Sequence, residues 1–258
     1  MEPLKGLARL LSHYKAVGLT HLPKGPEVER LLAFDPERRE ADIQGPSGTN
    51  MQGADGKGPD ECSTLLELKQ ALGSCRRCRL HQGRTKVVFG EGAEDARLML
   101  VGEAPGRKED LQGRPFVGRS GELLTKMLRA ISIERQEVFI TSVVKCRPPG
   151  NRTPKSDEIQ ACLPWLKRQI ELIRPSLILC LGTTSAHALL GSHEPMARLR
   201  GRFHELSGFN DLKIKVAVTY HPAYLLRFGG AKQKSLKLEA WHDLQMVERL
   251  YKELQGRS

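Results

Sequence analysis

The sequence predicts an α/β protein built on a parallel sheet that helices cover on both faces. Four short apolar runs, at 97–101, 138–144, 177–181 and 214–220, alternate along the chain with stretches of helical periodicity. Near-continuous apolar strands separated by helices are typical of parallel sheets that are buried on both sides. With 258 residues, the chain is long enough for one such domain and an extension.

Apolar residues recur at helical spacing between these strands, in 120–130, 157–173 and 183–190, and again from Trp241 to Tyr251. Loops rich in glycine, proline and charged residues follow the first, second and fourth strands directly. In parallel sheets the chemistry lies at the carboxyl ends of the strands. We therefore expect the functional site at that edge of the sheet.

The chain is predicted to have three parts. Residues 1–41 form a basic, partly helical extension. A flexible linker follows at 42–61, because 44–60 holds five glycines and two prolines among polar residues. The main globular domain then occupies 62–258.

Charge is the strongest compositional signal. The chain has 41 Lys+Arg against 30 Asp+Glu, a net charge of +11, which favours polyanions such as nucleic acid or anionic membrane surfaces. No run of 18 apolar residues and no signal-peptide core occur in the sequence. We expect a monomeric, cytoplasmic protein with no membrane association.

Four cysteines are spaced as they would be if one metal site joined distant parts of the chain. Cys75 and Cys78 form a CxxC turn, Cys146 ends the second apolar run, and Cys162 lies in the following helix. Four thiolates suit tetrahedral zinc or an iron–sulfur cluster, and these spacings do not decide between the two. Cys180, in mid-strand between leucines, is interpreted as a core residue.

The loop after the first strand contains a tight turn, Gly102 to Gly106, which aims backbone amides and the Glu103 carboxylate at the predicted site. Farther on, Phe116 stands among glycine and proline turns. An aromatic ring held this way is a stacking platform for a planar base. The alternative is a core anchor beneath the loop.

The loop after the second strand supplies Arg147, Asn151 and Arg152 beside a cysteine. We predict that its arginines contact DNA; the alternative is an ordinary basic loop.

After the fourth strand, His221 precedes a proline and is placed to donate a hydrogen bond to developing negative charge. The next residues include Leu225, Leu226 and Arg227. We predict that the leucines insert into a DNA duplex and that the arginine binds phosphate. The alternative is a structural histidine with core leucines.

As an ordered set, five segments resemble the family 4 uracil-DNA glycosylases over about two thirds of the chain. They are CRRC at 75–78, GEAPGRKED at 102–110, GRPFVGRSGELL at 113–124, VVKCRPPGNRTP at 143–154 and HPAYLLR at 221–227. The resemblance implies a three-layer α/β/α sandwich with a central four-stranded parallel sheet. It also implies a 4Fe-4S cluster that organises a DNA-facing loop, with Cys75, Cys78, Cys146 and Cys162 as its ligands.

The implied reaction is hydrolysis of the N-glycosidic bond of uracil in DNA, which leaves an abasic site for base excision repair. The base must be flipped out of the stack, because its anomeric carbon is inaccessible inside a duplex. The similarity assigns His221 to the uracil O2 and Glu103 to the water and sugar, with Asn151 as a further catalytic position. We expect a monofunctional enzyme with no lyase step.

By the same resemblance, six residues contact the substrate base: Gly102, Ala104, Gly106, Glu109, Phe116 and Ser142. Two of them depart from patterns seen in relatives. Ser142 stands where an asparagine usually reads the uracil edge, and one hydroxyl cannot pair with both N3–H and O4. Gly106 stands where some relatives carry a bulky ring that excludes the thymine methyl.

Three alternatives stay open at this point. One is an iron–sulfur protein that binds uracil or abasic sites in DNA with little turnover. Another is a glycosylase for a different deaminated base. The third is a zinc-bound hydrolase of free nucleotides.

Overall fold

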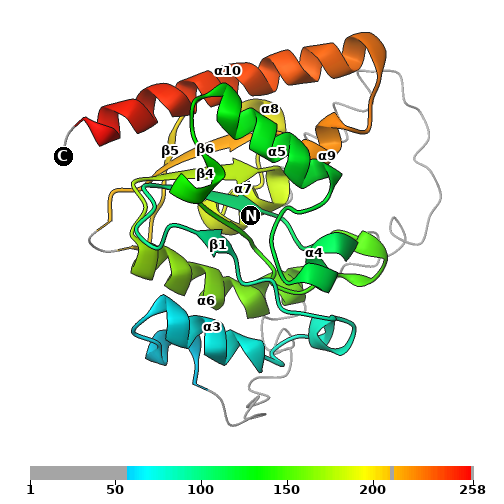
Figure 1. Ribbon diagram of the computed structural model, residues 1–258, viewed down its shortest axis with the longest axis vertical. Helices are drawn as coiled ribbons and strands as arrows, with labels where there is room; N and C mark the ends of the chain where they lie inside the picture. The colour runs from blue at the N-terminus through cyan, green and yellow to red at the C-terminus, as the bar shows by residue number, and fades with distance from the viewer. Residues whose placement is uncertain (1–56, 210–211, 257–258) are drawn as a thin grey trace, which may run out of the picture. The chain divides into compact units, whose positions relative to one another are not determined.

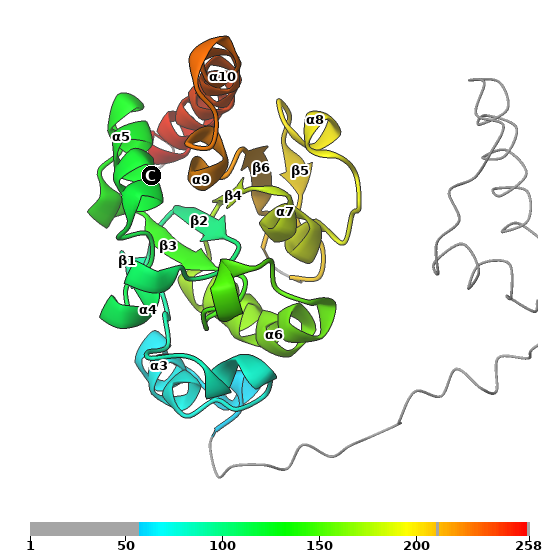
Figure 2. The ribbon, with the colours of Figure 1, turned by 90° about the vertical axis from the view of Figure 1, so that its right-hand side faces the viewer.

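The computed structural model describes residues 57–209 and 212–256, and a six-stranded sheet lies at their centre. Its strand order is β1-β3-β2-β4-β6-β5. Helices cover both faces: α5 and α10 lie on one side of the sheet, and α6 and α3 on the other (Figures 1 and 2). The predicted α/β class with a doubly covered sheet is confirmed.

The four predicted strands form the parallel centre of the sheet, in the order β3-β2-β4-β6. The predicted strand count of four is wrong, because two further strands pair antiparallel at the edges. Each of these edge strands has only two residues, too few to show an alternating pattern. The strands are β1 Glu91–Gly92, β2 Leu98–Gly102, β3 Phe139–Ser142, β4 Leu177–Leu181, β5 His204–Glu205 and β6 Lys215–Thr219.

The three helices predicted between strands are present within one residue of their expected bounds. α6 begins at Ser156, with Lys155 as its N-cap residue, and the Glu158 carboxylate accepts from the Lys155 amide at 2.8 Å. The α-helices are α3 Leu65–Gly73, α4 Arg107–Gln112, α5 Arg119–Ala130, α6 Ser156–Ile173, α7 Thr183–Leu190, α8 Met196–Leu199, α9 Pro222–Leu225 and α10 Gly230–Gln255. Short 3₁₀ turns occupy η2 Pro59–Glu61, η3 Arg79–Gln82, η4 Arg135–Glu137 and η5 Pro149–Asn151.

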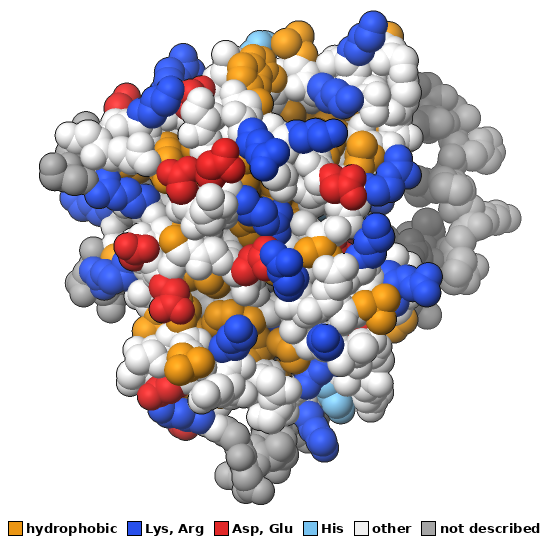
Figure 3. Space-filling view, in the orientation of Figure 1, with side chains coloured by type: hydrophobic (Ala, Val, Ile, Leu, Met, Phe, Trp, Pro, Cys, Tyr) orange, Lys and Arg blue, Asp and Glu red, His pale blue; other side chains and the backbone are white. Residues whose placement is uncertain are grey.

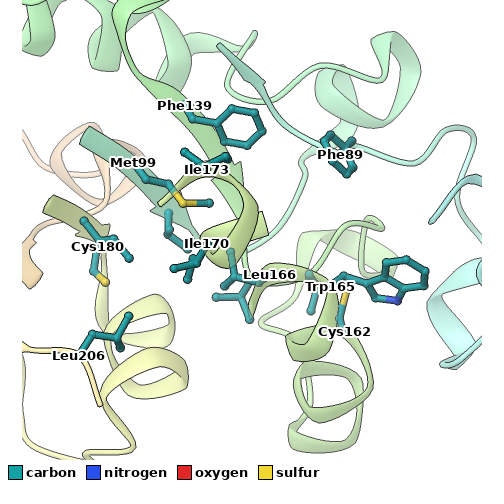
Figure 4. Close-up of a cluster of buried hydrophobic side chains, with 14 of the residues drawn as sticks. Phe89, Met99, Phe139, Cys162, Trp165, Leu166, Ile170, Ile173, Cys180 and Leu206 are labelled. Carbon is teal, nitrogen blue, oxygen red and sulfur yellow. The ribbon is translucent and has the colours of Figure 1, made fainter. Parts of the chain in front are cut away.

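The core consists of two apolar layers separated by the sheet. Successive residues of β2 alternate between them: Met99 and Val101 join the layer under α3 and α6, whereas Leu98 and Leu100 join the layer under α5 and α10. All four side chains are fully buried. Figure 4 shows part of the first layer, with side chains of α6 packed against the sheet. This packing fixes the strand ends from which the site is built.

The predicted extension, 1–41, and all of the predicted linker except 57–61 lie outside the described residues. Within the described part of the chain, no helix is both long enough and apolar enough to cross a bilayer.

Candidate active site at the carboxyl edge of the sheet

A cavity of about 580 Å³ lies at the carboxyl ends of the parallel strands. Its walls come from the segments that follow β2, β3, β4 and β6, so residues far apart in the sequence meet there. Figure 2 shows α4, α7 and α9, which follow three of these strands, grouped around the strand ends. The sequence placed the site at this edge and singled out three of the four loops.

Phe116 forms one wall of the cavity and is nearly buried, with 7 % exposure. Its ring lies against the end of β2: a Cβ atom added at Gly102 would stand 2.6 Å from Phe116 Cζ, so only glycine permits this approach. The ring centroid is 5.6 Å from that of His221, with 31° between the planes. Both interpretations of Phe116 describe it in part, since it is anchored in the core and faces the cavity.

Glu109 is buried and holds the loop that carries Phe116. Its carboxylate accepts hydrogen bonds from the amides of Val117 and Gly118, each at 2.9 Å. A Cβ atom at Gly106 would stand 2.8 Å from Glu109 Oε2. A larger residue at position 106 would therefore require the Glu109 Oε2 atom to shift.

Glu103 lines the cavity, and its orientation is set by a residue that the sequence did not reveal. Thr184, in the first turn of α7, donates its hydroxyl hydrogen to Glu103 Oε2. α7 follows β4, the strand whose loop lacks glycine–proline turns and charges. A hydroxyl residue two positions after Gly182 was the available signal, but it does not distinguish this contact from an ordinary helix start.

His221 is the N-cap residue of α9, and its ring lines the cavity. Nδ1 accepts a hydrogen bond from the Ala223 amide at 3.1 Å, so in the neutral ring the proton is on Nε2. Burial and, to a smaller extent, the charge of Arg227 lower the pKa of His221 to about 4, against the opposing effect of Glu109. His221 is therefore a neutral hydrogen-bond donor near pH 7.

Ser142, the last residue of β3, lines the cavity with 4 % exposure. It lies next to Gly102 in the parallel register, so the end of β3 and the Phe116 ring share one corner of the cavity. Ala104 lies in the turn on the same side. The six residues assigned to the base are thus close together in space.

Asn151 lies at the cavity mouth, where it is exposed and accepts a hydrogen bond from Arg147 Nε at 2.7 Å. Arg152 also lines the cavity, but its guanidinium binds Glu158 through two hydrogen bonds of 2.6 and 2.8 Å. The Glu158 side chain is fully buried, and the Arg152 hydrogen bond, opposed by burial, lowers its pKa to about 2. Arg152 therefore already has a carboxylate partner.

The prediction that Leu225 wedges into DNA is wrong. Leu225 is 1 % exposed and packs in the apolar layer under α5 and α10, because the four-residue helix α9 turns it inward. Leu226 is half-buried and Arg227 is exposed at the cavity rim. In Figure 3, Lys and Arg side chains gather along the right-hand margin, the side that faces the viewer in Figure 2.

The four predicted ligand cysteines come from three segments and lie in one neighbourhood. Cys146 and Cys162 are buried in the layer under α6, and Cys75 and Cys78 pack against that layer. Burial is the main cause that raises the pKa of the Cys146 and Cys162 thiols, that of Cys162 to about 12; Arg84 and Lys145 respectively oppose the shift, and neighbouring thiols add to it. The family resemblance implies that these four cysteines bind one negatively charged iron–sulfur centre.

Two nearby groups fit such a centre. Arg84 donates to Cys146 Sγ at 3.2 Å and to the Cys75 carbonyl oxygen at 2.9 Å, which ties the CxxC turn to the second loop. Among the described residues, Trp165 Nε1 is the one buried side-chain nitrogen or oxygen without a hydrogen-bond partner, and Figure 4 shows Trp165 beside Cys162. Across the same residues, no three Cys, His, Asp or Glu side chains meet in the arrangement of a single-ion site.

Within the described residues, no lysine lines the cavity. Two lysines do occur in the motif segments, Lys108 and Lys145. Lys145 is fully buried away from the cavity, where Nζ donates to Thr141 and Gln169 at 2.6 Å each. Burial lowers the pKa of Lys145 to about 7, against the opposing effect of Cys162 and Cys146.

Residues 89–245 match the model of the uracil DNA glycosylase superfamily. The chain belongs to that superfamily. It is 44% identical over 167 residues to a type-4 uracil-DNA glycosylase of Archaeoglobus fulgidus, an alignment that covers 63% of this chain and 83% of the relative. A type-4 enzyme of Pyrobaculum aerophilum is 43% identical, with 67% of this chain and 92% of the relative covered.

A type-5 uracil-DNA glycosylase of Pyrobaculum aerophilum is 30% identical, over 64% of this chain and 77% of the relative. Similarity to the superfamily therefore extends across two of its branches, with higher identity to type 4. The resemblance that the five motifs carry in the sequence is confirmed.

Proposed function

We propose that this superfamily member is a uracil-DNA glycosylase, which hydrolyses the bond between uracil and deoxyribose and leaves an abasic site. The observation that carries the proposal is the position of His221, a neutral donor that lies beside Phe116 in the wall of a cavity at the ends of four strands. The type-4 relatives support the same reaction. Since no lysine lines the cavity among the described residues, no amine is placed to form a Schiff base with the sugar.

The flipped base would stack on Phe116, whose ring lies between Gly102 and the loop that Glu109 holds. A fixed aromatic wall favours any planar base. Selectivity among bases therefore depends on polar groups at the base edge, of which the Ser142 hydroxyl is one.

As the glycosidic bond breaks, negative charge develops on the uracil and positive charge on the sugar. His221 would donate a hydrogen bond to the base oxygen from Nε2, which carries the proton of the neutral ring because Nδ1 accepts from the Ala223 amide. The Glu103 carboxylate would stabilise the cationic sugar and orient the attacking water. Thr184 keeps that carboxylate turned into the cavity.

We propose that Cys75, Cys78, Cys146 and Cys162 hold a 4Fe-4S cluster. The donor set fits, because four clustered thiols, an arginine that donates to one sulfur and an unpartnered indole N–H suit an anionic sulfur-rich centre. Bound there, the cluster supplies covalent anchors to the segment between Cys146 and Cys162. That segment carries Asn151 to the cavity mouth, so its anchoring would shape the surface that meets DNA.

Uracil-containing DNA is the proposed partner. Arg152 and Arg227 line the cavity, and Arg147 binds Asn151 at its mouth, in a chain of net charge +11. Arg227 is exposed, whereas Arg152 would contact phosphate only in competition with Glu158. DNA affinity is expected to fall steeply as salt rises.

A single-turnover assay tests the proposed reaction. The full chain is incubated in excess with labelled single-stranded and duplex oligonucleotides that contain one uracil, then treated with alkali. The proposal predicts strand breaks at uracil and none at a matched thymine. Tight binding without breaks would instead support a DNA-binding protein with little turnover.

The cofactor has a separate test. Protein purified without oxygen should be brown, contain iron and acid-labile sulfide, and absorb near ~400 nm, as such clusters do. Colourless protein that contains zinc alone would contradict the cluster.

Ser142 favours a second candidate, excision of another deaminated base. A single hydroxyl pairs with fewer edge atoms than an amide does, so it discriminates less against other bases. Replacing Ser142→Asn should raise the rate of uracil excision about tenfold if uracil is the substrate. A lower or unchanged rate for uracil, together with release of hypoxanthine or xanthine by the unchanged protein, would support the second candidate.

A further inference from the structure

A polar network, buried at Asp243 and open to solvent at Glu239, lies behind the strand end that carries His221. Arg200 follows α8, and its side chain is 12 % exposed. Its Nε donates to Asp243 Oδ2 at 2.8 Å, and its Nη1 donates to Glu239. Asp243 and Glu239 lie one turn apart on α10, so Arg200 connects that helix to the loop after α8. None of these three charged residues lines the cavity.

The same two carboxylates bind the last residues before His221. Thr219 Oγ1 donates to Asp243 Oδ2 at 2.8 Å, and Tyr220 Oη donates to Glu239 Oε2 at 2.8 Å. The Arg200 guanidinium also stacks on the Tyr220 ring, 4.5 Å from its centroid. Consecutive residues at the end of β6 are therefore fixed through their side chains to α10.

A contribution to stability does not by itself explain why the ion pair between Asp243 and Arg200 is placed in the interior. Asp243 is 2 % exposed, and burial raises its pKa against the opposing hydrogen bonds from Arg200 and Thr219. Desolvation of a buried ion pair often cancels its attraction, and apolar side chains of similar volume stabilise a core as well. Hydrogen bonds require a defined geometry, so the network specifies one position for the end of β6.

The other side of the strand end is fixed as well. The Thr219 carbonyl oxygen accepts from the Gly182 amide at 2.9 Å, which joins β6 to the start of α7. A Cβ atom at Gly182 would stand 3.3 Å from His221 Cβ, so the two segments touch at the histidine. A shift of the strand end would move the imidazole relative to Phe116.

We propose that Asp243 and Arg200 are positioning residues for His221, acting through Thr219 and Tyr220. The inference rests on the proposed role of His221 in uracil excision. Neither residue touches the substrate; they hold the backbone that aims the imidazole. Misplacement of a catalytic group by a fraction of an ångström to 1 Å is enough to slow chemistry strongly.

The test compares Thr219→Val with Thr219→Ser in the full chain, using single-turnover excision and equilibrium binding of uracil DNA. Valine keeps the shape of threonine but lacks the hydroxyl that binds Asp243, whereas serine retains it. We expect Thr219→Val and Asp243→Asn to slow excision about tenfold, with DNA affinity within about twofold of the unchanged protein. Thr219→Ser should restore most of the rate.

Glu248→Gln is the matched control, because it removes a solvent-exposed pair with Lys252 on the same helix. It should leave excision unchanged. If Glu248→Gln slowed excision as much as Asp243→Asn does, loss of any side-chain contact on α10 would have this effect, and the proposal would be overturned.

A double-mutant cycle separates positioning from a merely structural effect. If Thr219 acts through His221, adding Thr219→Val to His221→Ala should slow excision by less than about twofold. An equal loss in both backgrounds would overturn the positioning role, as would a normal rate for Thr219→Val beside a low rate for His221→Ala. Failure of the unchanged protein to release uracil would refute the proposed function itself.

Discussion

The cavity at the strand ends and the neighbourhood of the four cysteines differ in how their polar groups are satisfied. In the cavity, each reactive side chain already has an internal partner: Thr184 for Glu103, and the Ala223 amide for His221. Among the cysteines, burial raises the pKa of the Cys146 and Cys162 thiols and opposes the thiolate form that binds iron. The cavity is preorganised by the chain, whereas the proposed cluster site depends on metal to complete it.

Under the proposed function, this difference predicts separate roles for the two regions. Changes in the cavity should slow the chemical step and leave DNA binding intact. Changes among the cysteines should release iron and disturb the loop between Cys146 and Cys162. The following predictions test that division, beginning with the largest effect.

Replacing Glu103→Gln should slow single-turnover excision by about 10²–10⁴-fold, because the amide is neutral and cannot balance charge on the sugar or activate water. DNA affinity should stay within about twofold. Glu122→Gln, an exposed carboxylate on α5, is the control and should have no effect. If affinity and rate fell together at Glu103, the residue would be structural.

Replacing Thr184→Val should slow excision about tenfold, since a hydrogen bond to a charged group contributes about 1.5–3 kcal/mol. Thr184→Ser keeps the hydroxyl and should retain most of the rate. Rates for both variants at saturating DNA provide the measurement. Equal rates for valine and serine would show that the Thr184 hydroxyl does not orient Glu103.

Replacing Cys162→Ser should release iron and weaken DNA binding roughly tenfold, because the loop loses an anchor. The rate at saturating DNA should change less than it does in the Glu103 variant. Iron content, absorbance and binding are measured together. Cys180→Ala is the control: this thiol is buried in β4 outside the predicted ligand set, so its loss should leave iron in place. The ligand assignment would be contradicted if Cys180→Ala lost its iron while Cys162→Ser retained it.

Excision should be nearly independent of the ionisation of His221 between pH 6 and 8, since its pKa of about 4 keeps the ring neutral. Below about pH 6.5, the unfolded chain binds a proton at this histidine that the folded chain does not. The free energy of unfolding should therefore fall as pH decreases from about 6.5 toward 4. An NMR titration of the His221 ring with a midpoint near 6.5 would contradict this assignment.

The four central strands could be predicted because apolar runs of five to seven residues leave little choice of secondary structure. The edge strands could not, since β1 and β5 have two residues each and exist only through pairing with neighbours. Leu225 was mispredicted because a leucine in a short helix gives no sign of which face turns toward the core. We could predict that the loops of the site lie together, because the carboxyl ends of parallel strands lie at one edge of a sheet.

The residues that contact the proposed site residues from behind could not be predicted from the sequence. Thr184, Arg84 and Asp243 each act through a contact with a residue at least 24 positions away. Threonine, arginine and aspartate are also frequent on surfaces, so their types carry no signal. Only the packing of α7 and α10 against the strand ends, and of the CxxC turn near Cys146, gives these side chains their roles.

The most direct test of the account is the effect of His221→Ala on excision and on DNA affinity, measured on the same preparation. We predict that the single-turnover rate for uracil falls by about 10²–10³-fold, as expected for loss of one preorganised donor to developing charge. DNA affinity should remain within about twofold. A variant that excises uracil at the normal rate would contradict the account.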